Sequence, residues 1–212
     1  ALRAQTHEYS NKLHTLAGLI QIGATKEALE LIGRESSGYN ALLRQLSDQI
    51  QDPFLSAIIV GKYHRAMELK TQLELDPESW MSNIGHSSRS EKIVTILGNL
   101  MENALEASAS EEGQKKVSLS MTDVGNELIF EVEDSGSGIS EEQQKTIFDE
   151  GFSTKTGTGR GIGLQLVQKN LIQLDGHLTI GESSLGGARF TAYIPKTIIN
   201  GESNEHPGPD RG

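Results

Sequence analysis

The chain has 212 residues, with 19 Lys and Arg against 29 Asp and Glu and a formal net charge of −10. This length suits one or two domains with a hydrophobic core, and the acidic balance argues against a general nucleic-acid binder, which neutralises phosphates with Lys and Arg. The absence of cysteine excludes a disulfide scaffold and thiolate metal sites, and it agrees with a reducing compartment.

Targeting signals are missing from the sequence. No apolar run approaches the roughly 20 residues that a bilayer-spanning helix requires, and no signal peptide is visible. Because Ala1 already falls within a helical pattern, we expect the chain to be a fragment of a longer protein.

The first segment, residues 1–52, has the apolar spacing of a helical hairpin. Steps of four and three, typical of a heptad seam, connect Leu2, Thr6, Tyr9, Leu13, Leu16 and Ile20. After a break at Gly23, a second seam with the same spacing continues through Ala28, Leu31, Glu35, Leu42, Leu46 and Gln49 or Ile50, and Asp52-Pro53 ends the second helix. One hairpin has too little apolar surface to bury both stripes, so we predict a homodimer through a four-helix bundle. The alternative is a hairpin packed on its own second domain.

A second domain is predicted over residues 53–196. We expect helices over 54–68, from a capping box of Ser88 with Glu91 through Ala104, from Ser140 to Phe148, and over about 162–174. Strands are expected over 72–76, 117–121, 128–132, 177–182 and 189–194, with a two-residue hairpin turn at Gly125-Asn126. This order predicts an α/β two-layer sandwich on a mixed sheet, and hence an α+β chain overall. Residues 197–212 are polar, and we expect a disordered tail.

Glycine is enriched to 23 residues, seven of them between Gly136 and Gly163. Asp134-Ser135-Gly136-Ser137-Gly138 follows a predicted strand, where the carboxylate can accept a hydrogen bond from an exocyclic amine while Gly136 and Gly138 let a flat ring approach. An ordinary Asp-Gly turn is the alternative. The stretch from Gly157 to Leu164 leads into a helix, so its amides and Arg160 can cradle phosphates; a glycine-rich hairpin is the alternative. Neither a Rossmann fingerprint nor a P-loop fits this spacing.

Two amide side chains complete the pattern. Asn99 and Asn103 are four residues apart and therefore share one face of the long predicted helix. Amide oxygens suit a hard cation that already bridges phosphates, although single asparagines on helices are usually just solvated.

Five ordered motifs resemble the N, G1, F, G2 and G3 boxes of the ATP-binding domain of sensor histidine kinases. They are Asn99-x-x-x-Asn103, Asp134-x-Gly136-x-Gly138, Phe148-x-x-Gly151-Phe152, Gly159-x-Gly161-x-Gly163-Leu164 and Gly186-Gly187-Ala188-x-Phe190. The fold is shared with type II topoisomerase, mismatch-repair and anti-sigma-factor ATPases, and the resemblance covers roughly residues 53–195.

This resemblance implies ATP and Mg²⁺ as cofactors. Asp134 looks like the carboxylate that reads adenine, with Gly136 and Gly138 beside the ring. Asn103 looks like the Mg²⁺ ligand, with Asn99 near the phosphates. The phosphate-binding set is implied to be Lys155, Arg160 and the amides of Gly159, Gly161 and Gly163, with residues 151–158 as a mobile lid. Many relatives have a basic residue shortly after the second asparagine, whereas Glu106 and Ala107 stand here, which gives Lys155 and Arg160 the phosphate charge.

The first predicted helix offers a phosphoacceptor in His7, which Glu8 follows directly. A neutral imidazole nitrogen is a good nucleophile toward a phosphoryl group if a neighbour takes or orients the other ring proton. The family's His-Glu-x-x-Asn signature implies that Asn11 positions a water for the reverse hydrolysis. Zinc binding through His-Glu-x-x-His fails because Asn11 occupies the second ligand position; a plain surface histidine and His14, which lacks an adjacent acid, remain alternatives.

The string His7-Glu-Tyr-x-Asn-Lys-Leu-His14, without the usual proline, resembles the citrate/C4-dicarboxylate sensor subfamily. That implies a missing periplasmic sensor, membrane helices and PAS domain, which would make this the cytoplasmic portion of an inner-membrane sensor protein. We expect a hairpin for dimerisation and histidine phosphotransfer, an ATP-binding catalytic domain, and relay to a response-regulator aspartate with phosphatase activity. The alternatives are a phosphotransfer scaffold with a degenerate ATP site, and a stand-alone ATPase or serine kinase of the same fold.

Overall fold

The structure, a computed structural model, describes residues 17–26, 28, 37–147 and 162–196 of the chain. Its named elements follow one another in the order α3 (Ser37–Gln49), α4 (Pro53–Glu68), β1 (Gln72–Leu75), α5 (Ser88–Ala109), β2 (Lys116–Thr122), β3 (Glu127–Asp134), α6 (Glu141–Thr146), α7 (Ile162–Gln173), β4 (His177–Glu182) and β5 (Ala188–Pro195).

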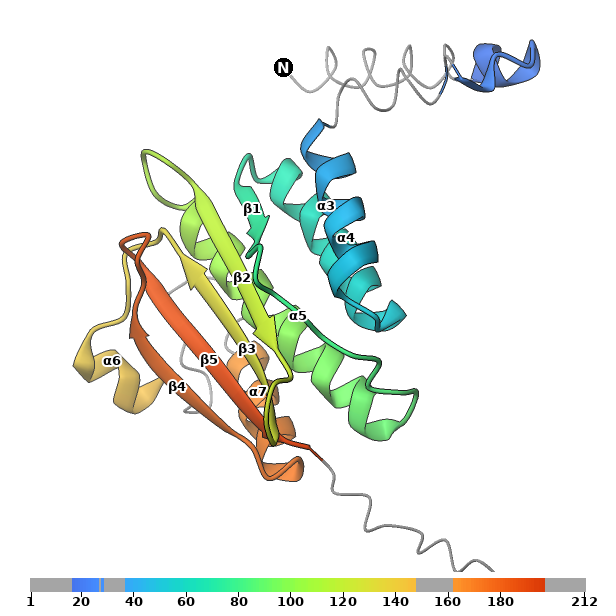
Figure 1. Cartoon of the computed structure of the whole chain (residues 1–212). Coiled ribbons are helices and arrows are strands. Elements are labelled where there is room, and N and C mark those ends of the chain that lie inside the picture. The colour runs from blue at the N-terminus through green and yellow to red at the C-terminus, as the bar shows by residue number, and fades with distance from the viewer. Residues whose placement is uncertain (1–16, 27, 29–36, 148–161, 197–212) are drawn as a thin grey trace, which may run out of the picture.

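The strands form one five-stranded mixed sheet in the order β1-β2-β3-β5-β4. β1 and β2 run parallel, and the other neighbouring pairs run antiparallel. Helices α5 and α7 cover one face of this sheet, and α4 packs beside α5 against β1 (Figure 1). The predicted two-layer α+β domain with a mixed sheet is therefore confirmed, whereas the four-helix bundle stays a prediction.

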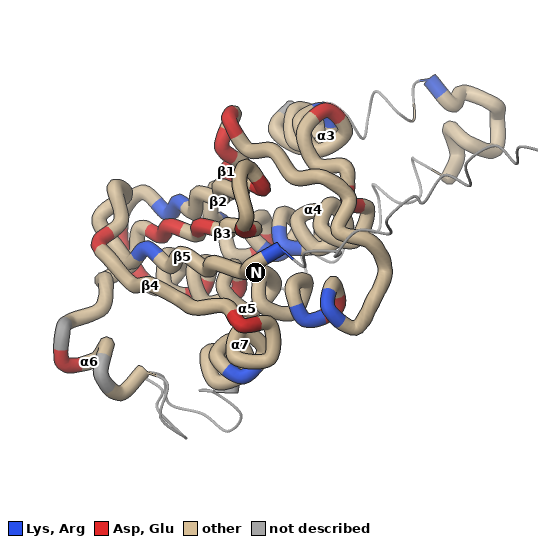
Figure 2. Tube along the Cα trace, turned by 60° about the horizontal axis from the view of Figure 1, so that its bottom comes forward, with Lys and Arg blue, Asp and Glu red and all other residues tan. Residues whose placement is uncertain are grey.

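Strict alternation in β3 decides where its last residue points. Leu128, Phe130 and Val132 are buried under the helices, while the residues between them face the other side of the sheet. Asp134 continues this even-numbered set, so its carboxylate enters the helix-covered side although it is charged. Acidic residues recur along β3 (Figure 2). The opposite face of the sheet has a hollow lined mainly by polar residues, among them Asp76, Ser118, Ser120, Glu131 and Glu133.

Two local predictions were wrong in detail. The capping box of α5 lies one residue earlier than expected, between Ser87 and Ser90, because the Ser87 hydroxyl accepts from the Ser90 amide and the Ser90 hydroxyl accepts from the Ser87 amide. The β2–β3 connection is no two-residue turn, since the ladder closes at Thr122 opposite Ile129. Asp123 in this connection instead accepts hydrogen bonds from the Ser82 amide and hydroxyl, which attach the loop to the segment between β1 and α5.

The described part of the first segment packs on the second. Leu42 and Leu46 of α3, which we expected on the dimer seam, are buried in the same core as α4 and β1. The Gln45 side chain donates to the carbonyls of Leu75 and Asp76 at the end of β1, over 2.9 Å and 3.0 Å. This part of the stripe is thus covered within one chain, as in the alternative of a hairpin packed on its own domain. The boundary at residues 52–53 remains a prediction.

The break inside the predicted hairpin and the end of its second helix both lie where the sequence predicted them. The helical residues 17–21 end in a turn at Ile22-Gly23, where Gly23 has a φ of +75°, and helix resumes at Thr25. Asp52 is fully buried and caps α4, where it accepts from the amides of Phe54 and Leu55.

Among the described residues, no helix combines the length and hydropathy needed to cross a membrane. The tail 197–212 lies outside the described residues.

Candidate nucleotide-binding site

Asp134 is the last residue of β3, and the turn that begins there leads toward α6. Its Oδ1 accepts hydrogen bonds from the amides of Gly136 at 2.8 Å and Ala188 at 3.1 Å. Its main-chain carbonyl accepts from the Gly187 amide at 3.1 Å. The hydrogen bonds that described residues give to the carboxylate all end on Oδ1, so Oδ2 is the oxygen left for a ligand that donates a hydrogen bond.

Glycines are required around this carboxylate because the backbone segments approach one another very closely. A Cβ at Gly187 would lie 2.1 Å from Asp134 Oδ1, and a Cβ at Gly136 would lie 2.9 Å from both Asp134 Oδ1 and the Ala107 Cβ. Gly138 has a φ of +75°, which favours glycine. The G1 and G3 motifs, about fifty residues apart in sequence, therefore form one site.

The two asparagines of α5 face the start of α7. A Cβ at Gly163 would lie 3.0 Å from Asn99 Oδ1 and 3.7 Å from Asn103 Oδ1. The Asn99 side-chain amide donates to the Thr95 carbonyl over 2.7 Å, which turns its oxygen toward α7. Gly163 lies in the first turn of α7, and the amides and dipole of a helix start favour a phosphate. The structure thus brings Asn99, Asn103 and Gly163 together.

A single row on α5 connects these two regions. Asn99, Asn103 and Ala107 are four residues apart, so they lie along one side of the helix. Asn99 and Asn103 meet Gly163 at one end of the row, and Ala107 meets Gly136 of the Asp134 turn at the other. This layout can hold an elongated ligand with an amine-bearing ring at Asp134 and an anionic end at α7.

Burial raises the pKa of the Asp134 carboxyl, and the nearby Glu133 charge acts in the same direction. The amide hydrogen bonds from Ala188 and Gly136 favour the charged form, but they do not outweigh burial. Keeping this buried carboxyl group charged therefore costs stability. A ligand amine that hydrogen-bonds the charged form would offset that cost.

The Asn103 side chain is of a type that could help hold a magnesium ion together with a nucleotide. Among the described residues, the buried Nδ2 of Asn103 has no hydrogen-bond partner, so this NH2 group can donate to an oxygen of a ligand such as a phosphate. Within the described segments, no group of three or more His, Cys, Asp or Glu side chains could hold a metal by itself. Mg²⁺ commonly takes one or two protein oxygens together with substrate phosphates and water, and an Asn103 oxygen can supply such a ligand.

Several predicted site residues lie outside the described residues: His7, Glu8, Asn11, Lys155, Gly159, Arg160 and Gly161, together with the lid 151–158. Their roles stay predictions. Gly187, named in the sequence only as part of the G3 motif, and Ala107 were not among the predicted binding residues, yet the structure places both against the Asp134 loop. The fourfold spacing from Asn103 is the signal that could have indicated Ala107.

Residues 88–198, just over half of the chain, match the family described as "Histidine kinase-, DNA gyrase B-, and HSP90-like ATPase". The chain belongs to this family. The matched segment contains Asn99, Asn103, Asp134 and Gly163, the residues whose contacts are described above.

Curated relatives of the chain are named as sensors. "Sensor protein CitS" of Halalkalibacterium halodurans is 44% identical over 197 residues, which cover 92% of this chain and 37% of that protein. "Probable C4-dicarboxylate sensor kinase" of the same organism is 38% identical over 201 residues, and "Sensor histidine kinase CitA" of Klebsiella pneumoniae is 33% identical over 208 residues. They cover 92% and 98% of this chain but only 37% of each relative. The resemblance to the citrate/C4-dicarboxylate sensor kinases is confirmed, and the chain spans little more than a third of these relatives.

Solved structures agree with this assignment. The catalytic domain of histidine kinase ThkA has 25% identity and a TM-score of 0.55, and the match covers 68% of this chain and 90% of that one. Full-length ShkA in complex with AMPPNP, with 23% identity, a TM-score of 0.56 and coverage of 67% and 29%, supports the fold alone.

Proposed function

We propose that this chain is the catalytic core of a homodimeric sensor histidine kinase, which binds Mg-ATP and transfers the γ-phosphoryl group to His7. The observation that carries this proposal is the convergence of Asp134, Asn99, Asn103 and the start of α7 on one site. The names of the relatives, which describe sensor kinases, point in the same direction.

In this proposal each part of the site has one task. Asp134 Oδ2 accepts a hydrogen bond from the adenine amine, and Gly136 and Gly138 allow the ring to approach the backbone. Asn99, Asn103 and the first turn of α7 hold the triphosphate end, with Lys155, Arg160 and the amides of Gly159, Gly161 and Gly163 completing the phosphate contacts. Mg²⁺, when bound, neutralises phosphate charge.

The transfer itself exchanges one bond for another. A ring nitrogen of His7 forms a bond to the γ-phosphorus, the bond from that phosphorus to the oxygen bridging the β-phosphate breaks, and ADP leaves. Glu8 takes or orients the proton on the other ring nitrogen. The phosphoryl group then passes to an aspartate of a response regulator, and Asn11 positions a water when the reaction runs as a phosphatase.

We further propose that the hairpin forms the dimer and that the chain is the cytoplasmic portion of an inner-membrane sensor. Two points support this. The exposed Ile20, just before the hairpin turn, and Ile22, within it, leave apolar surface for a second copy. The relatives are named sensors and are much longer than this chain.

Labelling with γ-³²P-ATP and MgCl₂ tests the proposal. We expect wild type and His14→Gln to acquire a label that is lost in acid and survives base, and His7→Gln to remain unlabelled while it still binds ATP. A labelled His7→Gln protein would refute the acceptor. A base-labile label would favour a serine kinase, and failure of wild type to bind a fluorescent ATP analogue would favour a scaffold with a degenerate site.

A further inference from the structure

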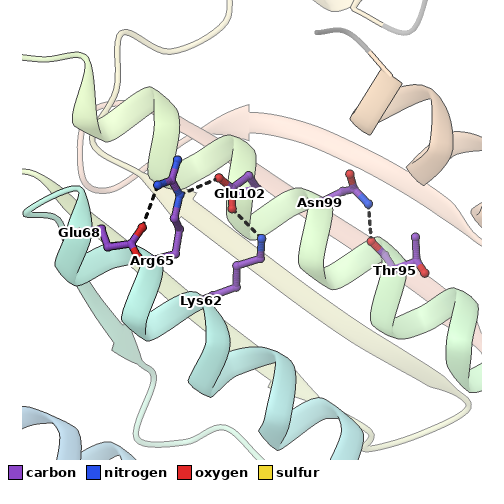
Figure 3. Close-up of polar contacts among 6 residues, drawn as sticks. All are labelled: Lys62, Arg65, Glu68, Thr95, Asn99 and Glu102. Carbon is purple, nitrogen blue, oxygen red and sulfur yellow. Dashed lines mark hydrogen bonds and ion pairs between the residues drawn. The ribbon is translucent and has the colours of Figure 1, made fainter. Parts of the chain in front are cut away.

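A cluster of four charged side chains joins α4 to α5 beside the asparagine row. Figure 3 shows Lys62 and Arg65 of α4 reaching toward Glu102 of α5. Lys62 Nζ lies 2.6 Å from Glu102 Oε2, and Arg65 Nε lies 3.1 Å from Glu102 Oε1, so each carboxylate oxygen binds a different cation. Arg65 is held in turn by Glu68, with 3.0 Å between Nη1 and Oε2.

The Lys62–Glu102 pair differs from an ordinary surface ion pair, whereas Arg65 and Glu68 are 39% and 68% exposed. The side chain of Lys62 is 17% exposed and that of Glu102 is 30% exposed, so water screens their attraction only in part. Burial opposes ionisation of Glu102, but the hydrogen bonds and charges of Lys62 and Arg65 prevail and hold its pKa below the usual range. Glu102 therefore stays charged and bound at neutral pH.

The position of Glu102 on α5 gives the cluster its significance. Glu102 directly precedes Asn103, and successive side chains of a helix point about 100° apart. Glu102 faces α4, while Asn99 and Asn103 face Gly163 of α7. The buried side chains of α5 already restrain the helix by close packing, and two hydrogen-bonded ion pairs on one flank add directional contacts that oppose rotation about the helix axis.

Small rotations would matter at this site. A side-chain atom about 6 Å from the axis moves about 1 Å when the helix turns by about 10°. A displacement of about 1 Å at a reacting group can lower the rate of an enzyme about a hundredfold. Anchoring one flank of α5 thus controls where the asparagine oxygens lie on the other.

We propose that Glu102, held by Lys62 and Arg65, is a positioning residue that fixes the rotation of α5 and so places Asn99 and Asn103 for Mg-nucleotide binding. This inference rests on the proposed function. None of the three charged side chains needs to touch the ligand.

Electrostatics and positioning predict opposite effects of Glu102→Gln. Removing the carboxylate leaves local charge more positive, which by simple attraction would strengthen binding of a triphosphate. Loss of the anchor would weaken binding, and the loss would fall on the magnesium-dependent part. The sign of the change therefore separates the two explanations.

The test is a calorimetric titration of the full chain with AMPPNP at a series of MgCl₂ concentrations and, separately, with ADP in EDTA. For Glu102→Gln we expect the MgCl₂ concentration at half-saturation to rise about tenfold, the usual size of such outer-shell effects, with ADP affinity in EDTA within about twofold of wild type. Glu74→Gln is the matched control, because it breaks the Lys116–Glu74 pair of 2.8 Å on the sheet and should leave both values unchanged.

Variants on α4 keep the test decisive if Glu102→Gln does not fold, as judged by its thermal transition. Lys62→Gln should reproduce the shift of about tenfold with ADP affinity in EDTA within about twofold of wild type, whereas simple loss of a cation would weaken both. Lys62→Arg, which keeps the cation, should restore the wild-type value. Unchanged or tighter Mg-AMPPNP binding in folded Glu102→Gln, or in Lys62→Gln, would overturn the inference. Failure of wild type and Glu74→Gln to bind nucleotide would instead refute the proposed function.

Discussion

Replacing Gly187 by alanine tests how closely β5 must approach the Asp134 turn. A Cβ there would lie 2.1 Å from Asp134 Oδ1, 2.5 Å from the Asp134 carbonyl oxygen and 2.5 Å from the Gly136 nitrogen. Contacts between non-bonded heavy atoms are favourable only near 3.5 Å, so the segments must separate by about 1 Å. Because two of these neighbours are backbone atoms, no change of rotamer relieves the clash.

The expected destabilisation follows from what this separation breaks. The hydrogen bonds from the Gly187 amide to the Asp134 carbonyl and from the Ala188 amide to Asp134 Oδ1 contribute about 1 kcal/mol each. Residual overpacking costs at least about 1 kcal/mol more, which brings the loss to about 3 kcal/mol. In a chain of this size that lowers the unfolding midpoint by about 10 °C.

Thermal unfolding followed by circular dichroism and titration with a fluorescent ATP analogue measure the outcome. We expect Gly187→Ala to melt at a lower temperature and to bind the nucleotide more weakly, because the Asp134 carboxylate is displaced. Gly61→Ala is the matched control, because Gly61 lies in α4 with nothing within 4 Å of a Cβ, and alanine there should stabilise the helix slightly. Wild-type melting and affinity in Gly187→Ala would refute the proposed close approach.

Three further substitutions probe other parts of the structure. Asp134→Asn should weaken ATP binding about a hundredfold in equilibrium titration, because an amide NH₂ replaces the accepting Oδ2. Burial raises the folded-state pKa of Asp134, so the wild type loses stability as pH rises through that pKa. Asp134→Asn should therefore melt no lower than wild type at neutral pH, and the difference between the two melting midpoints should vanish in acid. A lower midpoint for the variant at neutral pH would contradict the raised pKa. Asn103→Asp should weaken Mg-ATP binding by placing a like charge beside the phosphates, and unchanged affinity in the same titration would count against its role. Leu46→Ala, at a residue only 4% exposed, should cost about 3 kcal/mol in urea unfolding, whereas Leu43→Ala at a 38% exposed position should cost much less; equal losses would argue against the docking of α3.

Much of the nucleotide site could be predicted from local sequence. The alternation of β3 places Asp134 on the buried side of the sheet, and the fourfold spacing of Asn99 and Asn103 places them on one helix face. The resemblance to the histidine-kinase motifs then implied their roles. These features are readable because each depends on the period of one strand or one helix.

The surface on which α3 packs could not be predicted from local spacing. Leu42 and Leu46 have the spacing of a helical seam, but spacing identifies only a face that must be buried and not the surface that covers it. In the structure that surface is α4 and β1 of the same chain, to which Gln45 adds its hydrogen bonds. The shift of the α5 cap from Ser88 to Ser87 has a similar origin, since several neighbouring serines can cap.

The sequence by itself determined the order of helices and strands from α4 to β5, the carboxylate at the end of β3 and the asparagine pair, because these follow from short-range periodicity and backbone preferences. Only the tertiary structure decided that Gly187 closes on Asp134, that Gly163 meets the asparagines, and that Lys62 and Arg65 bind Glu102. Each of those contacts joins segments far apart in the chain. Their distances depend on how whole elements pack, which no local pattern encodes.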